Sequence, residues 1–120
     1  MDFDVLDSIT IDQIGIFDSN SDGLQTQTIN AHIYDRNNPA SPLASLTFSP
    51  GDDGTLVGSH RFKDLATTLM LEAGFEGTIV AEGYGGGDPN YNSGGGMPWL
   101  FEDRGFGLIY FVGSCRFGPA

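Results

Sequence analysis

Apolar and polar residues alternate along several short stretches of the chain, which is the pattern of β-strands that bury one face. In residues 28–35 two isoleucines and an alanine share one face, with polar side chains on the other. Residues 8–17 carry four isoleucines, and their alternation shifts by one position at residues 12–13. We therefore expect two strands here, the first of them interrupted by a β-bulge.

Five further strands are expected, at residues 43–48, 56–63, 68–71, 77–84 and 106–117. The last of these is apolar on both faces, which is typical of a central strand. His60 shares a face with Leu56 and Phe62, so we interpret it as a core residue rather than a ligand.

Seven or eight short strands with turn residues between them predict an all-β fold, an antiparallel β-sandwich of the jelly-roll-like kind. The chain has 120 residues, which suits one domain with a modest core at about residues 5–117. Neither an internal repeat nor a linker divides it, so we expect a single module.

The most specific motif is an oxygen-rich turn in which Asp18, Asn20 and Asp22 alternate and Gly23 follows at once. Calcium takes six to eight oxygen ligands, and short Asp and Asn side chains at alternate positions supply them. The glycine allows a sharp turn, after which Leu24 can offer its backbone carbonyl. These residues therefore predict a Ca²⁺ site.

The loop does not match an EF-hand. The twelfth position counted from Asp18 is Ile29, where an EF-hand places a bidentate glutamate. Strand-like residues precede the loop instead of a helix, so the remaining ligands have to come from elsewhere. The alternative is a plain polar turn, because Asp, Asn, Ser and Gly are the usual turn formers.

A second oxygen-rich stretch places Asp88, Asn90 and Asn92 at alternate positions. It could form a second cation site or complete the first, with Glu82 as a bidentate carboxylate. The alternative is an ordinary loop, since the same residue types are common loop formers.

Aromatic residues surround this second stretch and suggest a ligand-binding edge. Tyr84, Tyr91 and Trp99 lie beside acidic and amide groups, a combination that suits sugar rings. The alternative for Trp99 is a plug at the end of the core. Glu82, Glu102 and Asp103 could supply a carboxylate pair for glycan hydrolysis, but so small a sandwich rarely holds a deep cleft.

The charge balance narrows the range of partners. The formal net charge is −11, from 16 acidic against five basic residues. Nucleic acid and anionic membranes need clusters of Lys and Arg, so neither is expected. No apolar run is long enough to cross a membrane. The single cysteine, Cys115, lies in an apolar run and is read as a buried, inert thiol.

The run from residue 9 to residue 24 resembles the opening of an uncharacterised extracellular β-sandwich domain of bacterial secreted proteins, including proteins with PEP-CTERM sorting signals. Weaker matches follow at residues 33–35, 43–45, 71–74, 78–81 and 111–114. The resemblance implies an exported surface or matrix module, and it carries over no catalytic residue. The acidic N-terminus does not look like a signal peptide, so such a signal is not expected within this chain.

Together these observations predict a secreted or cell-surface, calcium-binding module that adheres to a glycan or cell-surface polysaccharide. The alternative is a structural spacer, stiffened by calcium, within a larger multidomain surface protein. A small glycan hydrolase is the third and least favoured reading.

Overall fold

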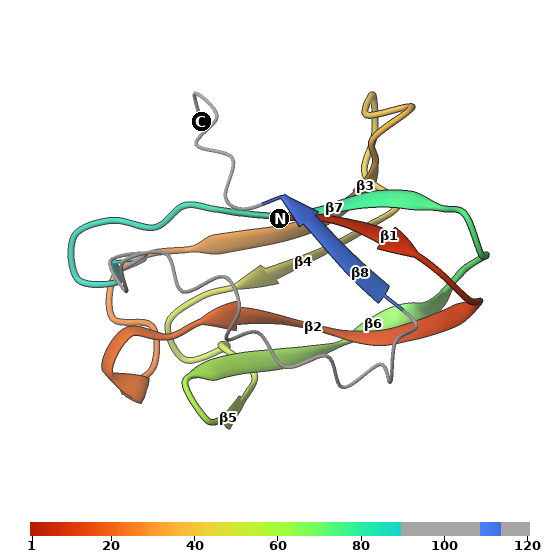
Figure 1. The fold of residues 1–120 in the computed structure, drawn as a ribbon. Coiled ribbons are helices and arrows are strands. Elements are labelled where there is room, and N and C mark those ends of the chain that lie inside the picture. The colour runs from red at the N-terminus through yellow and green to blue at the C-terminus, as the bar shows by residue number, and fades with distance from the viewer. Residues whose placement is uncertain (90–108, 114–120) are drawn as a thin grey trace.

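A computed structural model describes residues 1–89 and 109–113 of the chain and contains eight strands (Figure 1). One short 3₁₀ turn, Ser19–Ser21, follows the second strand, and the described residues include no α-helix. The strands are β1 (Asp2–Val5), β2 (Ile9–Phe17), β3 (Ile29–Asp35), β4 (Ala44–Phe48), β5 (Thr55–Val57), β6 (His60–Leu71), β7 (Glu76–Glu82) and β8 (Ile109–Gly113).

The strands form two antiparallel sheets that pack face to face. The large sheet has the order β4-β3-β7-β1-β8, and the small sheet has the order β2-β6-β5. Neither sheet closes into a barrel, so the prediction of an all-β antiparallel sandwich is confirmed. The described part of the chain contains no helix long and apolar enough to cross a membrane.

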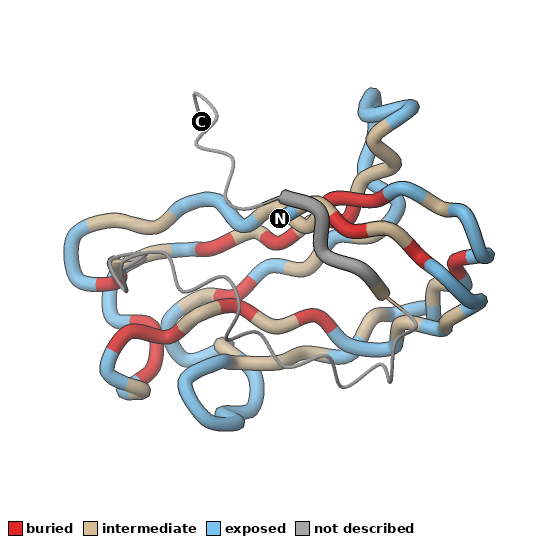
Figure 2. The backbone as a smooth tube through the Cα atoms, viewed as in Figure 1, coloured by how far each residue is buried: buried red, intermediate tan, exposed pale blue. Residues whose placement is uncertain are grey.

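The core lies between the sheets, and its buried residues recur along strands of both sheets (Figure 2). In β3 the alternation matches the burial, since Ile29, Ala31 and Ile33 are all buried while the residues between them are partly exposed. The remaining core residues come from both sheets and from the loop after β2: Phe3, Val5, Ile14, Ile16, Leu24, Phe48 and Leu71.

The bulge in β2 is also confirmed. The pairing of β2 with β6 shifts register between Ile11 and Gln13, where the alternation of the sequence slips. Across this irregularity the pairing advances from Ile11 to Gln13 along β2 and from Leu69 to Asp64 along β6. The isoleucines on both sides of it belong to the core or pack against it. The bulge therefore lets both halves of one long strand contribute to the same core.

Two expectations about the strands were wrong. Residues 56–63 do not form one strand, because the chain reverses between β5 and β6 at Gly58, where φ is +63°. As a result β6 runs without a break from residue 60 to residue 71, and His60 is exposed beside Phe17 instead of lying in the core. The strand expected at residues 106–117 is described only as β8, which among the described strands lies at an edge of the large sheet and not at its centre.

Candidate functional site

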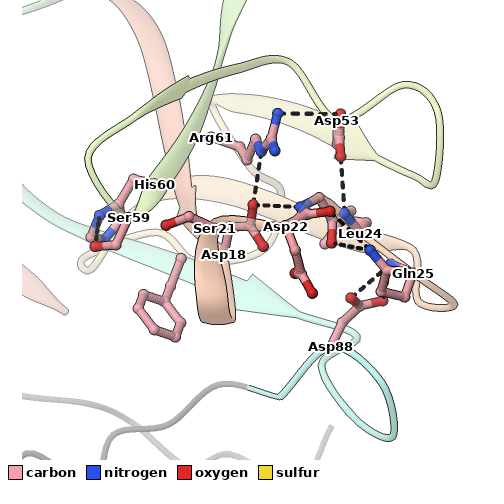
Figure 3. Close-up of polar contacts among 12 residues, drawn as sticks. Asp18, Ser21, Asp22, Leu24, Gln25, Asp53, Ser59, His60, Arg61 and Asp88 are labelled. Atoms are coloured by element: carbon pink, nitrogen blue, oxygen red, sulfur yellow. Dashed lines mark hydrogen bonds and ion pairs between the residues drawn. The ribbon is translucent and has the colours of Figure 1, made fainter.

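One end of the sandwich brings together several of the residues that the sequence singled out, among them Asp18, Asp22 and Asp88 (Figure 3). The loop between β2 and β3 meets the turn before β5, the start of β6 and the stretch after β7. Four ionisable residues from these segments form what we call the anchoring cluster: Asp18, Asp53, Arg61 and Asp88. Three of the four are carboxylates, and each of those three accepts a hydrogen bond from the backbone of the β2–β3 loop.

Asp18 is the most deeply buried member of the anchoring cluster, with 2% of its surface exposed. Its Oδ2 accepts hydrogen bonds from the backbone N–H of Gly23 at 2.9 Å and from Nε of Arg61 at 2.8 Å. The hydrogen bond from Arg61 to Asp18 is the main cause that raises the pKa of the guanidinium above its usual value. Asp18 is therefore paired with Arg61 in the interior of the protein.

Asp53 links the same arginine to the next residue of the loop. Its Oδ2 accepts the N–H of Leu24 at 2.9 Å, and its Oδ1 lies 3.8 Å from Nη1 of Arg61. Asp53 was not predicted from the sequence, because its turn lacks alternating oxygens and its partners are remote in the chain. Only the hairpin between β5 and β6 brings Asp53 and Arg61 together.

Asp88 anchors the other side of the loop and has 5% of its surface exposed. Its carboxylate accepts the backbone N–H groups of Gln25, Thr26 and Gln27 at 2.7–2.9 Å. Burial acts to raise the pKa of Asp88, but the three N–H donors outweigh it and the pKa falls below its usual value. The carboxylate of Asp88 thus accepts the hydrogen bonds of three consecutive backbone amides, as a neighbouring strand would do in a sheet.

Tyr84 connects the stretch after β7 to the end of β2. Its hydroxyl donates a hydrogen bond to the carbonyl of Phe17 at 3.0 Å, and burial raises the pKa of this hydroxyl to about 12. The preceding Gly83 has φ +106°, and a Cβ there would lie 2.2 Å from the carbonyl oxygen of Thr28. The sequence predicts Tyr84 as a ligand-binding residue, whereas in the structure its polar atom is bonded within the protein.

The backbone of the predicted calcium loop is a tight turn in which three of four consecutive residues have positive φ. Asn20 and Ser21 have φ of +65° and +55°, and Gly23 has φ of +84°. Residues other than glycine adopt positive φ only where the surroundings hold them there, and Asn is the most tolerant of them. The hydrogen bonds from Gly23 and Ser21 to Asp18 hold the turn in this shape.

The predicted metal ligands are only partly brought together. Asp18 lies beside the positive charge of Arg61, while Asn20 and Asp22 are exposed at the tip of the loop. Glu82 does not join them, because its carboxylate contacts His32 on the outer face of the large sheet. Within residues 1–89 and 109–113, no group of three or more His, Cys, Asp or Glu side chains is arranged to hold a metal ion.

The remaining predicted site residues lie outside the described residues. These are Asn90 and Asn92 of the second oxygen-rich stretch, and Tyr91 and Trp99 of the expected ligand-binding edge. The glycan-binding edge therefore stays a prediction.

Comparison with protein-family models, with curated proteins and with solved structures found no match to this chain. The resemblance to an exported bacterial domain accordingly stays a prediction as well. What the site can do has to be argued from its own geometry.

Proposed function

We propose that this protein is a non-catalytic structural module, a rigid β-sandwich spacer within a larger exported surface protein. The observation that supports this proposal is that the carboxylates of the anchoring cluster are engaged in contacts within the protein. The carboxylates of the anchoring cluster are turned inward onto Arg61 and onto backbone N–H groups of one loop. A loop held in this way gives the module a stiff end without a bound ion.

Physical chemistry favours this reading of buried carboxylates. A buried charge is strongly unfavourable unless it is paired and hydrogen-bonded, and each of these carboxylates meets at least one backbone donor. The five amides from Gly23 to Gln27 would otherwise have no strand partner, since β3 begins only at Ile29. The anchoring cluster thus replaces a regular strand pairing at this end of the sandwich.

Calcium binding at the same loop is the second candidate, and two observations favour it. Asn20 and Asp22 are exposed at alternate positions next to Asp18, and Gly23 makes the sharp turn that such a loop needs. The net charge of −11 also favours binding of a cation. In this candidate the ligands are Asp18, Asn20, Asp22 and the carbonyl of Leu24, and the affinity is that of extracellular modules, on the order of 10⁻⁴ to 10⁻³ M.

Amide hydrogen exchange separates the two candidates. For the spacer, the amides of Gly23, Leu24 and Gln25 should exchange slowly in EDTA, and added Ca²⁺ should leave their rates unchanged. For the calcium module, they should exchange quickly in EDTA and become protected as Ca²⁺ is added. The second result would overturn the spacer proposal.

A thermal unfolding series gives an independent measurement. A ligand that binds only the folded state raises the melting temperature by mass action. If the loop has no calcium site, Ca²⁺ should therefore change the melting temperature no more than Mg²⁺ does. Asp22→Ala is the test variant, and Asp12→Ala, which removes an exposed acid from the bulge of β2, is its matched control. A calcium-specific rise that Asp22→Ala abolishes and Asp12→Ala retains would establish the calcium module.

A further inference from the structure

A second polar constellation lies on the outer face of the large sheet, away from the anchoring cluster. It comprises His32 of β3, Ser45 of β4 and Glu82 of β7, three neighbouring strands (Figure 1). Ser45 is the direct cross-strand partner of His32, and Glu82 is paired with Asn30, two residues before His32. The pleat of the sheet therefore directs all three side chains to the same face.

The imidazole of His32 bridges the other two side chains. Its Nδ1 lies 2.7 Å from Oγ of Ser45, and its Nε2 lies 3.2 Å from Oε1 of Glu82. The side chain of His32 is 17% exposed and that of Glu82 is 50% exposed. Both ends of the ring are thus held by neighbours, and of the pair formed with Glu82 it is the Glu82 side chain that is the more open to solvent.

The separation of the two side chains is close to that of two ligands of a borderline divalent metal such as Zn²⁺. Zinc bonds to His nitrogen and to carboxylate oxygen are both about 2.0–2.2 Å long, so two such ligands in a tetrahedral site lie about 3.3–3.5 Å apart. The observed separation of 3.2 Å between Nε2 and Oε1 is close to this span. The metal would therefore need only a small movement of the exposed Glu82 side chain.

Ser45 would act as the outer partner of such a site. A metal-binding histidine usually hydrogen-bonds through its other ring nitrogen, which fixes the tautomer and the orientation of the ring. If Nδ1–H donates to Oγ of Ser45, the lone pair of Nε2 points toward the carboxylate of Glu82. Two acceptors then face each other, and a cation between them removes the repulsion.

We propose that His32 and Glu82 bind one Zn²⁺-type divalent cation, with water completing its coordination and Ser45 positioning the imidazole. Nothing in this proposal depends on the spacer or the calcium function. An imidazole nitrogen favours borderline metals such as zinc, nickel and copper, whereas calcium selects oxygen ligands. The site offers two side chains and not the three or four of a closed structural site, so it is reversible and open to exchange.

The test is a titration of the intact chain with Zn²⁺ at about pH 7.5, where a free imidazole is mostly neutral. Isothermal calorimetry should show one saturable site per chain. His32→Ala and Glu82→Gln should each weaken the affinity at least tenfold, and Ser45→Ala should weaken it about 10–100-fold. The chain supplies its own control, because its only other histidine is His60, so His60→Ala should leave the affinity unchanged.

A second readout keeps the test independent of folding. Sub-stoichiometric Ni²⁺ or Cu²⁺ should broaden the ring resonances of His32 before those of His60, and excess Ca²⁺ should not reverse the effect. Equal affinity in the wild type, His32→Ala and Glu82→Gln would overturn the site. Loss of binding in His60→Ala alone would also overturn it, while unchanged affinity in Ser45→Ala would remove Ser45 from the proposal.

Discussion

Two arginines of this protein each gather several carboxylates, yet they do so in different surroundings. Arg61 pairs with Asp18, which is almost completely buried, and with Asp53. Arg36, which directly follows β3, contacts Asp4 and lies 3.5 Å from Glu76, whose side chain is half exposed. Asp2 lies 3.7 Å away from the same arginine.

The two groups differ in whether their carboxylates also accept hydrogen bonds from a loop backbone. Asp18 and Asp53 also accept backbone N–H groups of the β2–β3 loop, so each links a charge pair to the position of the main chain. The carboxylates around Arg36 belong to residues of β1 and β7, whose backbones are already paired in the sheet. The comparison indicates that the Arg61 group determines local structure, whereas the Arg36 group balances charge on a sheet that is formed without it.

The largest expected effect is therefore at Asp18. Asp18→Ala leaves Arg61 without its closest partner and leaves the N–H of Gly23 without an acceptor. Removing one partner of a buried pair is strongly destabilising, so the free energy of unfolding should fall by about 3–5 kcal/mol. Urea denaturation at neutral pH measures the change.

Asp4→Ala is the matched control, since it removes a carboxylate that contacts the other arginine. Its side chain is 34% exposed, and an exposed pair contributes about 0–1 kcal/mol. If the two substitutions lower the free energy of unfolding by the same amount, the distinction between the two arginines is wrong.

Asp88 should give the next largest effect, and its effect should depend on pH. Asp88→Asn replaces a carboxylate that accepts three amides, so we expect a loss of about 2 kcal/mol at neutral pH. Because the folded-state pKa of Asp88 lies below its usual value, this stabilisation is present above about pH 4 and is lost as the pH falls through the folded-state pKa.

Urea denaturation at several pH values between about 6 and 2 tests this expectation. The wild-type and Asp88→Asn curves of stability against pH should lie apart at neutral pH and converge in acid. Asp7→Asn, an exposed position, serves as the control and should follow the wild type throughout. Parallel curves for Asp88→Asn and the wild type would show that the carboxylate charge is not what anchors the loop.

The sequence predicts the sandwich well because its signals are local. Alternation in β3 and the shifted alternation in β2 follow directly from which side chains face the core. The reversal between β5 and β6 was missed because Leu56, His60 and Phe62 fall on one face of a continuous strand, and only two turn-forming residues, at positions 58 and 59, separate β5 from β6. The edge position of β8 depends on strand order, which alternation does not encode.

The candidate site was predictable only in part, because its contacts are remote in sequence. The motif around Asp18 was visible from spacing alone, but Arg61 lies 43 residues away from it. Asp88 reaches the loop across a separation of more than 60 residues. Spacing can identify groups of oxygens along one segment, whereas it cannot show whether a cation or an arginine will neutralise them.

The smallest expected effect is at Arg36. Arg36→Gln removes the positive charge between Asp4 and Glu76, so the remaining carboxylates repel one another across the surface of the sheet. At low ionic strength the free energy of unfolding should fall by about 1 kcal/mol or less. In about 1 M NaCl the Debye length shortens to about 3 Å, so this loss should nearly disappear.

Arg61→Gln is the contrasting variant, and its free energy of unfolding should fall several times more. Salt should barely reduce this loss, because the partner Asp18 is shielded from solvent. Equal salt dependence for the two variants would mean that Arg61 also acts as a surface charge, and the loop would then need another anchor.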